Sequence, residues 1–341
     1  MGFKTKARRL ENLTWAASGN SGDIDIKKNL KAPIMALELR LAGLITAGGG
    51  GTVSGLVEDA PAGQISRIRI TGQNKKTGQS RTIYDGQARW AYWLGNLHTQ
   101  VAMSLTAPLP TAAATGDFLL GILIPLTSFS GSAVYLDPRD YSTLTLRLEY
   151  GNGTTDYGST NVSTITVTTI EVSALEVVEG LPEDAQHFEP RWDITQMAVE
   201  SAKDDQRSQS VAAGGLVPYT ILHTHDDSGV GNAQRVDGLV KEVRVFHGGD
   251  EQLWNSWAQL MERTKSRRGL AQATAMPAGY VLVEFLDALN TMYDKVLDFS
   301  IKSSGSVPQG ITAITPASGD RCDLLALVCE PNAAMRASMA A

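Results

Sequence analysis

The sequence predicts a mostly β protein with little helix, built from two similar domains. Its 341 residues correspond to about two domains of ordinary size, and 43% apolar residues are enough for each to bury a core. Thirty-three glycines, 13 prolines and only 19% charged residues favour strands and turns over long helices. Segments of alternating apolar and polar residues recur along the chain, as in strands with one buried face.

The start of the chain differs in charge from the remainder. Its first 31 residues hold seven basic and three acidic side chains, whereas the whole chain has a net charge of −6. This contrast predicts a basic N-terminal arm, residues 1–35, on an acidic body, although a merely solvated terminus would have the same composition. Nucleic-acid binding by the body is therefore disfavoured, and only the basic arm is a candidate.

Alternating segments predict the strands of a first domain, which we expect at residues 36–178. In the clearest segment Leu37, Leu39 and Leu41 fall on one face and Arg40 falls on the other. Further strands are predicted at residues 65–70, 118–126, 144–150 and 165–175.

Two segments depart from the β pattern and predict one helix in each domain. Between residues 85 and 99, Trp90 and Trp93 begin an apolar stripe with the spacing of an amphipathic helix. Trp254 and Trp257 begin the same stripe in the second half. Large aromatic side chains at this spacing usually dock a helix onto a sheet, so we expect all four to be core anchors.

A polar segment with two prolines, residues 179–190, predicts the linker between the domains. The second domain is then expected at residues 191–332, followed by a C-terminal tail at 333–341. Its predicted strands lie at residues 192–199, 216–224 and 240–246.

The two halves repeat the same order of elements. The Trp-x-x-Trp pair recurs at an offset of 164 residues, and the apolar strand that follows it recurs at 163. Because sequence identity between the halves is slight, the inference of a duplication rests on this order of strand, helix, loop and three further strands. Two unrelated β domains that share the order are the alternative.

Two β domains of about 140 residues, each with roughly eight strands and one helix, fit jelly rolls better than the smaller immunoglobulin sandwich. Together with the basic arm, the repeated Trp pairs and loops rich in small residues, this arrangement resembles the double jelly-roll major capsid proteins of icosahedral viruses. That family is the tectivirus, corticovirus and adenovirus lineage, which includes lipid-containing bacteriophages. The resemblance covers roughly residues 36–332 and is one of architecture.

The resemblance implies a structural protein of the virion shell, without enzymatic activity or cofactor. Family members form homotrimers in which six jelly rolls make a pseudo-hexagonal capsomer. The implied partners are further copies of the chain, neighbouring capsomers, and penton and minor capsid proteins, after synthesis in the host cytoplasm. The arm residues Lys4, Lys6, Arg8 and Arg9 would then face an internal lipid membrane or the packaged genome.

His223, His225 and Asp227 are the best candidates for metal chemistry. Two histidines at i and i+2 of a strand lie on one face and could share a metal ion. The segment partly resembles the His-x-His-x-Asp-His motif of metallo-β-lactamase-fold hydrolases, but Ser228 stands where the last histidine belongs. We therefore expect an exposed strand end that runs into a turn, with no metal.

Other function classes stay open. A carbohydrate-binding or carbohydrate-active β sandwich, or a phage tail or receptor-binding component, would need exposed aromatic residues, yet four of the six tryptophans are assigned to helices. Cys322 and Cys329 are too few for a disulfide scaffold and are expected to be buried thiols. The longest apolar run, residues 118–126, is far short of the ~20 residues of a membrane-spanning helix.

Overall fold

The computed structural model divides into two compact units. The first comprises Met1–Arg191 and Pro331–Ala341, and the second comprises Trp192–Glu330. None of the described helices is long and apolar enough to cross a membrane. The described residues are 4–51, 54–55, 59–99, 110–127, 134–156, 159–180, 188–202, 207–211, 215–227, 234–268, 277–285, 297–305 and 311–332.

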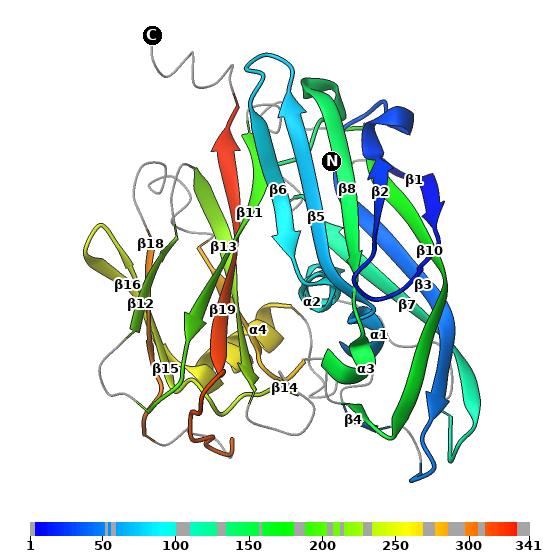
Figure 1. The fold of residues 1–341 in the computed structure, drawn as a ribbon. Helices are drawn as coiled ribbons and strands as arrows, with labels where there is room; N and C mark the ends of the chain where they lie inside the picture. Colours follow the sequence, from blue (N-terminus) through cyan, green and yellow to red (C-terminus); the bar gives the residue numbers. More distant parts are fainter. Residues whose placement is uncertain are drawn as a thin grey trace. The chain divides into compact units, whose positions relative to one another are not determined.

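Two four-stranded antiparallel sheets form the body of the first unit and lie face to face (Figure 1). The first sheet has the order β1 (Lys4–Leu13), β10 (Val162–Glu179), β3 (Ile34–Ala47) and β7 (Thr115–Pro125). The second sheet has the order β2 (Ser21–Asp25), β8 (Tyr141–Tyr150), β5 (Ile65–Asn74) and β6 (Ser80–Gly86).

Shorter elements complete the described part of the first unit. They are η1 (Ile26–Asn29), α1 (Asp59–Ala62), α2 (Ala88–Thr99), η2 (Pro138–Asp140), α3 (Gly153–Asp156) and the small pair β4 (Ser54–Gly55) and β9 (Ser159–Thr160).

The core of the first unit confirms the predicted alternation. Leu37, Leu39 and Leu41 of β3 are fully buried, whereas Arg40 is exposed. Leu146 and other aliphatic side chains of the second sheet are also fully buried. Each such side chain contributes roughly 1.5–3 kcal/mol by leaving water.

The second unit has the same two-sheet construction. One sheet contains β11 (Phe188–Ala198), β19 (Arg321–Pro331) and β13 (Leu216–Asp226), and β13 also pairs with β17 (Tyr280–Glu284) and β14 (Gln234–Arg235). The other has the order β12 (Arg207–Val211), β18 (Leu297–Lys302), β15 (Glu242–His247) and β16 (Asp250–Ser256). Helix α4 (Trp257–Arg267) follows β16.

The strand order shows that the two units have the same topology, as the repeated order of elements predicted. When the eight long described strands of each unit are numbered along the chain, one sheet has the order 1-8-3-6 and the other 2-7-4-5, in both units. The segments matched by sequence offset occupy equivalent places, because β7 and β17 are both sixth strands and β8 and β18 both seventh. This pairing of eight antiparallel strands is a jelly roll.

Each unit places its helix between the fifth and sixth strands, and the helix covers the sixth. In the first unit, Gly95 of α2 packs closely on Leu123 of β7. A Cβ atom added at Gly95 would lie only 2.7 Å from the Leu123 Cβ and 3.1 Å from the Leu123 carbonyl oxygen. In the second unit, the Thr264 hydroxyl of α4 accepts a hydrogen bond of 3.0 Å from the Leu282 backbone N–H of β17. The helices therefore cover equivalent strands.

The prediction of a separate basic arm at residues 1–35 is wrong for the described part of that segment. Lys4–Leu13 forms β1 and pairs with β10, and Ser21–Asp25 forms β2. The jelly roll therefore starts at the first described residue. Composition misled because an edge strand such as β1 can pair without a buried face, and none of its ten residues is buried.

The predicted linker, residues 179–190, overlaps two strands. Strand β10 ends at Glu179 and β11 begins at Phe188, while residues 181–187 lie outside the described residues. The second unit spans Trp192–Glu330, and the second domain was expected at residues 191–332. The tail at 333–341 also lies outside the described residues.

Candidate functional site

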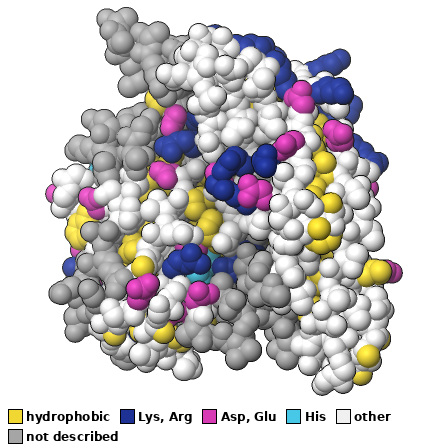
Figure 2. Space-filling model, viewed as in Figure 1, with side chains coloured by type: hydrophobic (Ala, Val, Ile, Leu, Met, Phe, Trp, Pro, Cys, Tyr) yellow, Lys and Arg dark blue, Asp and Glu magenta, His cyan; other side chains and the backbone are white. Residues whose placement is uncertain are grey.

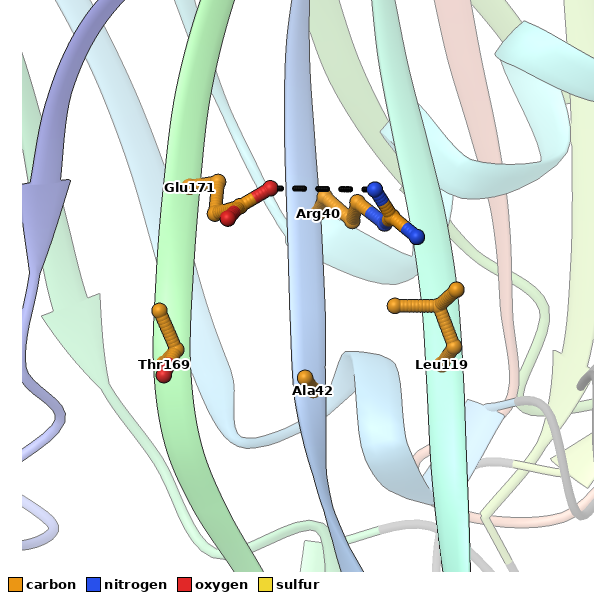
Figure 3. Close-up of a pocket in the computed structure, with 5 residues that line it drawn as sticks. All are labelled: Arg40, Ala42, Leu119, Thr169 and Glu171. Atoms are coloured by element: carbon orange, nitrogen blue, oxygen red, sulfur yellow. Dashed lines mark ion pairs between the residues drawn. The ribbon is translucent and has the colours of Figure 1, made fainter.

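The outer surface of the first sheet carries a shallow hollow. Because the leucines of β3 point into the core, the alternation of the strand turns Arg40 and Ala42 outward. Ala42 lies opposite Leu119 of β7 and Thr169 of β10. These four residues and Glu171 line a hollow of about 230 Å³, and the small Ala42 side chain leaves its centre open (Figure 3).

Glu171 at the border of the hollow is shared by two arginines. Its Oε2 atom lies 3.8 Å from Nη1 of Arg40, and its Oε1 atom lies 3.6 Å from Nη2 of Arg9. All three side chains are well exposed, so solvent screening keeps each pair at about 1 kcal/mol or less. This triad of one carboxylate and two guanidinium groups has one positive charge in excess.

The four basic residues predicted to form the arm lie together on β1, along the edge of this sheet. Figure 2 shows basic side chains, with acidic ones between them, on the side of the first unit where β1 lies. Lys4 pairs with Glu179 at 2.5 Å, and Arg8 and Arg9 pair with other glutamates of β10. Lys6 is exposed. Their contact with a lipid membrane or genome stays a prediction.

Glu176 of β10 fixes β1 to the sheet. Its side chain is only 1% exposed, and its carboxylate accepts hydrogen bonds from Nε of Arg8 at 2.6 Å and from the backbone N–H of Lys31 at 2.9 Å. Burial alone would raise the pKa of Glu176, but hydrogen bonds from Arg8 and the backbone of Lys31 and Ala32 outweigh it and lower the pKa. The carboxylate is therefore held in its charged form.

Three of the four predicted helix anchors are core residues. Trp90 and Trp93 are buried in α2, and Nε1 of Trp93 donates a hydrogen bond of 2.6 Å to Asp59. Trp257 is fully buried at the start of α4. These side chains dock their helices, as the spacing predicted.

The prediction for Trp254 is wrong. This residue lies in β16, before the helix, and is 58% exposed. Helix α4 begins only at Trp257 because Ser256 is its N-cap and forms a capping box with Gln259. The outward ring of Trp254 instead packs beneath the guanidinium carbon of Arg244, which is 4.1 Å from the ring centroid.

Arg244 is held over Trp254 by two glutamates. Its Nη2 atom lies 3.0 Å from the carboxylate of Glu242, and its Nη1 atom lies 3.8 Å from that of Glu251. This triad of one guanidinium and two carboxylates has one negative charge in excess. A tryptophan held in this way is a rigid, exposed contact residue.

The histidine segment in the second unit is buried, so the expectation of an exposed strand end is wrong for His223 and His225. Both are fully buried in β13, with ring centroids 5.5 Å apart. Nε2 of His225 accepts a hydrogen bond of 3.0 Å from Nε of Arg321, which occupies the lone pair that a metal would need. Asp227 lies beyond the strand end.

Among the described residues, no group of three or more His, Cys, Asp or Glu side chains is placed to hold a metal ion. Cys322 and Cys329 are buried free thiols, as predicted, and burial raises the pKa of both. The hollow and the exposed Trp254 are accessible features of the described surface.

Sequence reasoning missed both of these features. The capping box Ser256-x-x-Gln259 was a readable signal that the helix begins after Trp254. The hollow had no such signal, because it depends on the register of three strands that are distant in the chain.

Comparison with known proteins identifies the architecture. No family model and no curated protein matches the chain. The crystal structure of the major capsid protein of Sulfolobus turreted icosahedral virus is similar over 98% of both chains, with a TM-score of 0.70 and 13% sequence identity. This likeness decides the fold. The chain is a double jelly roll.

A second structure from the same virus and one from a bacteriophage have the double jelly-roll fold in common with this chain. The chain in the atomic structure of the Sulfolobus virus gives a TM-score of 0.68 at 12% identity, with 96% of this chain and 91% of that chain covered. The major capsid protein of bacteriophage PM2 gives a TM-score of 0.55 at 11% identity, with 97% and 98% covered. The fold that the sequence resemblance implied is thereby confirmed.

Proposed function

We propose that this double jelly roll is a structural major capsid protein of an icosahedral virion. The observation that carries the proposal is the match in fold to a viral major capsid protein over 98% of both chains. Two jelly rolls of identical strand order in one chain support it further, because a shell subunit needs similar contact edges repeated around its perimeter. The role is architectural rather than catalytic.

The capsomer in this proposal is a homotrimer. Three copies of the chain supply six jelly rolls, which match the six neighbours of a hexagonally packed tile. Neighbouring capsomers, penton proteins and minor capsid proteins are the proposed partners, and the virion shell is the proposed location. A contact of Lys4, Lys6, Arg8 and Arg9 with an anionic membrane or genome belongs to the same proposal. Lys4, Arg8 and Arg9 would have to make this contact while each is paired with a glutamate.

The carbohydrate-binding alternative has less support. Trp254 is an exposed aromatic residue on a sheet, as such a site would require, but Arg244 covers one face of its ring. The remaining large exposed apolar side chains among the described residues are Leu44 and Val178, which do not form an aromatic platform.

The mass of the purified chain in solution tests the proposal. We expect size-exclusion chromatography with light scattering to give three times the chain mass of 36.5 kDa. Electron microscopy of the same material should show hexagonal capsomers. A chain that stays monomeric at all concentrations tested, with no such particles, would show that the proposed function is wrong.

A further inference from the structure

The outer face of the first sheet carries accessible side chains. Strands β3 and β10 present the exposed Arg40 and the half-exposed Glu171, and Leu44 of β3 is 38% exposed. This face is therefore open to contact.

The hollow on this face can hold an aromatic side chain. Its volume is about 230 Å³, and protein cavities of about 150 Å³ admit benzene. Ala42 and Leu119 give it an apolar floor, while Arg40 and Glu171 form a charged border on one side (Figure 3). An apolar floor with a charged border suits the insertion of one large side chain.

Trp254 is the side chain that fits this description. At 58% it is the most exposed of the large apolar side chains in the described residues. Arg244 and the two glutamates fix its environment, so little conformational freedom is left to lose on docking. Exposed tryptophans beside arginines are characteristic of the centres of protein interfaces.

The charged triads beside the two features are complementary. Beside the hollow, Glu171 lies between Arg9 and Arg40, and this triad has one positive charge in excess. Beside the tryptophan, Arg244 lies between Glu242 and Glu251, and this triad has one negative charge in excess. The excess charges would attract each other and fix the orientation of the contact.

We propose that Trp254 of one copy of the chain inserts into the Ala42 hollow of a second copy. This inference rests on the proposed function, because it specifies one contact of the homotrimer. The two surfaces differ, so the contact is heterologous, and a threefold axis closes it into a ring. Glu251 then lies near Arg40, and Arg244 lies near Glu171.

Two substitutions test the contact from its two sides. Trp254→Ala removes the inserted side chain, and Ala42→Trp fills the hollow from within its own chain. Because both positions are accessible, we expect each variant to keep the thermal unfolding midpoint of the wild-type monomer. We expect each to raise the concentration at which trimers half-dissociate by roughly 30-fold or more, the effect of losing a hot-spot residue.

A matched control and a charge exchange make the test specific. Val178→Ala removes another exposed apolar side chain, which is 48% exposed and lies outside the proposed contact, and it should leave trimerisation unchanged.

Arg40→Glu and Glu251→Arg should each weaken trimers, whereas the double variant should regain most of the wild-type affinity. Acrylamide quenching of tryptophan fluorescence should fall on assembly in the wild type and not in Trp254→Ala.

The possible outcomes separate this inference from the proposed function. If the wild type is a trimer and both Trp254→Ala and Ala42→Trp trimerise equally well, the inferred contact is wrong and the capsid proposal stands. If the wild type is a monomer under all conditions, both are wrong. If maltohexaose changes the fluorescence of the monomer in a Trp254-dependent way and the variants still trimerise, the residue serves carbohydrate binding instead.

Discussion

Glu176 joins three segments of the first unit through one carboxylate. It belongs to β10, accepts a hydrogen bond from Arg8 of β1, and also binds the backbone of Lys31 before β3. A buried charge of this kind is stabilising only while its partners are present, since an unpaired carboxylate would lose its hydration without compensation. The residue is therefore sensitive to substitution and to pH.

Glu176→Gln should destabilise the chain by about 1.5–3 kcal/mol at neutral pH, because the hydrogen bond from Arg8 loses its charged acceptor. The lowered pKa of Glu176 means that its stabilisation is present above the ordinary glutamate pKa and is lost as the pH falls through the lowered value. Urea unfolding of wild type and variant should show a difference at pH 7 that shrinks in acid.

Glu179→Gln is the control for this prediction. Glu179 pairs with Lys4 on the same two strands, but the side chains are 64% and 71% exposed. Solvent screens such a pair, so the control should change the stability by less than about 1 kcal/mol. Equal effects of the two substitutions, or a Glu176→Gln effect that persists in acid, would contradict the role given to Glu176.

Individual side chains were predictable where one strong pattern governed them. The burial of Leu37, Leu39 and Leu41 follows from alternation alone. Trp254 was misassigned because a spacing of three residues also fits a helix, and a local capping interaction at Ser256 decided where the helix begins. Spacing identifies an apolar stripe, but the cap determines its first residue.

Helix α4 depends on that capping interaction. The Ser256 hydroxyl accepts a hydrogen bond of 3.2 Å from the Gln259 backbone N–H, and the Gln259 side chain accepts one of 2.9 Å from the Ser256 backbone N–H. Ser256→Ala should therefore destabilise the second unit by about 1 kcal/mol, measured by chemical denaturation. Ser256→Asp keeps an acceptor at the N-cap and should cost only a few tenths of that amount. Identical curves for the alanine variant and the wild type would argue against the cap.

Strands with a buried face were predicted more reliably than strands without one. The segments at 65–70, 118–126 and 216–224 all lie within or across strands of the structure, because a buried face imposes an alternating or continuous apolar pattern. Strand β1 carries no such pattern and was taken for an arm. Its place is decided by backbone pairing with β10, which leaves no mark in composition.

The hollow was beyond sequence reasoning for a similar reason. Ala42, Leu119 and Thr169 become neighbours only through the register of β3 with β7 and β10. A shift of one residue in either pairing would exchange inward and outward side chains and remove the hollow. Sequence patterns specify which face a residue takes, but the lateral register depends on packing across the whole sheet.

Assembly of the complete molecule should weaken as salt is added. The proposed contact brings together two triads of opposite excess charge whose side chains are partly exposed, so mobile ions compete with the attraction. Between about 0.05 and about 0.5 M sodium chloride, the trimer dissociation constant should rise. Light scattering at several protein concentrations measures this change.

Glu251→Gln is the matched variant for the salt series. It keeps the size of the side chain and removes one of the two carboxylates beside Arg244, so its dissociation constant should depend less on salt than that of the wild type. A dissociation constant that is constant across the salt range, or that falls with added salt, would show that charge does not guide the contact.

The helices over the sixth strands have a further consequence for the sheets they border. A sheet normally has two edges from which pairing can spread to other molecules, and a run of such pairings produces fibres. Here α2 occupies one edge of the first sheet at β7, and α4 does the same at β17 in the second unit. A sheet with one edge occupied can accept a foreign strand on the other side but cannot pass the pairing onward. Each helix therefore limits strand pairing on its side of the sheet, which matters at the high local concentrations that the proposed shell would require.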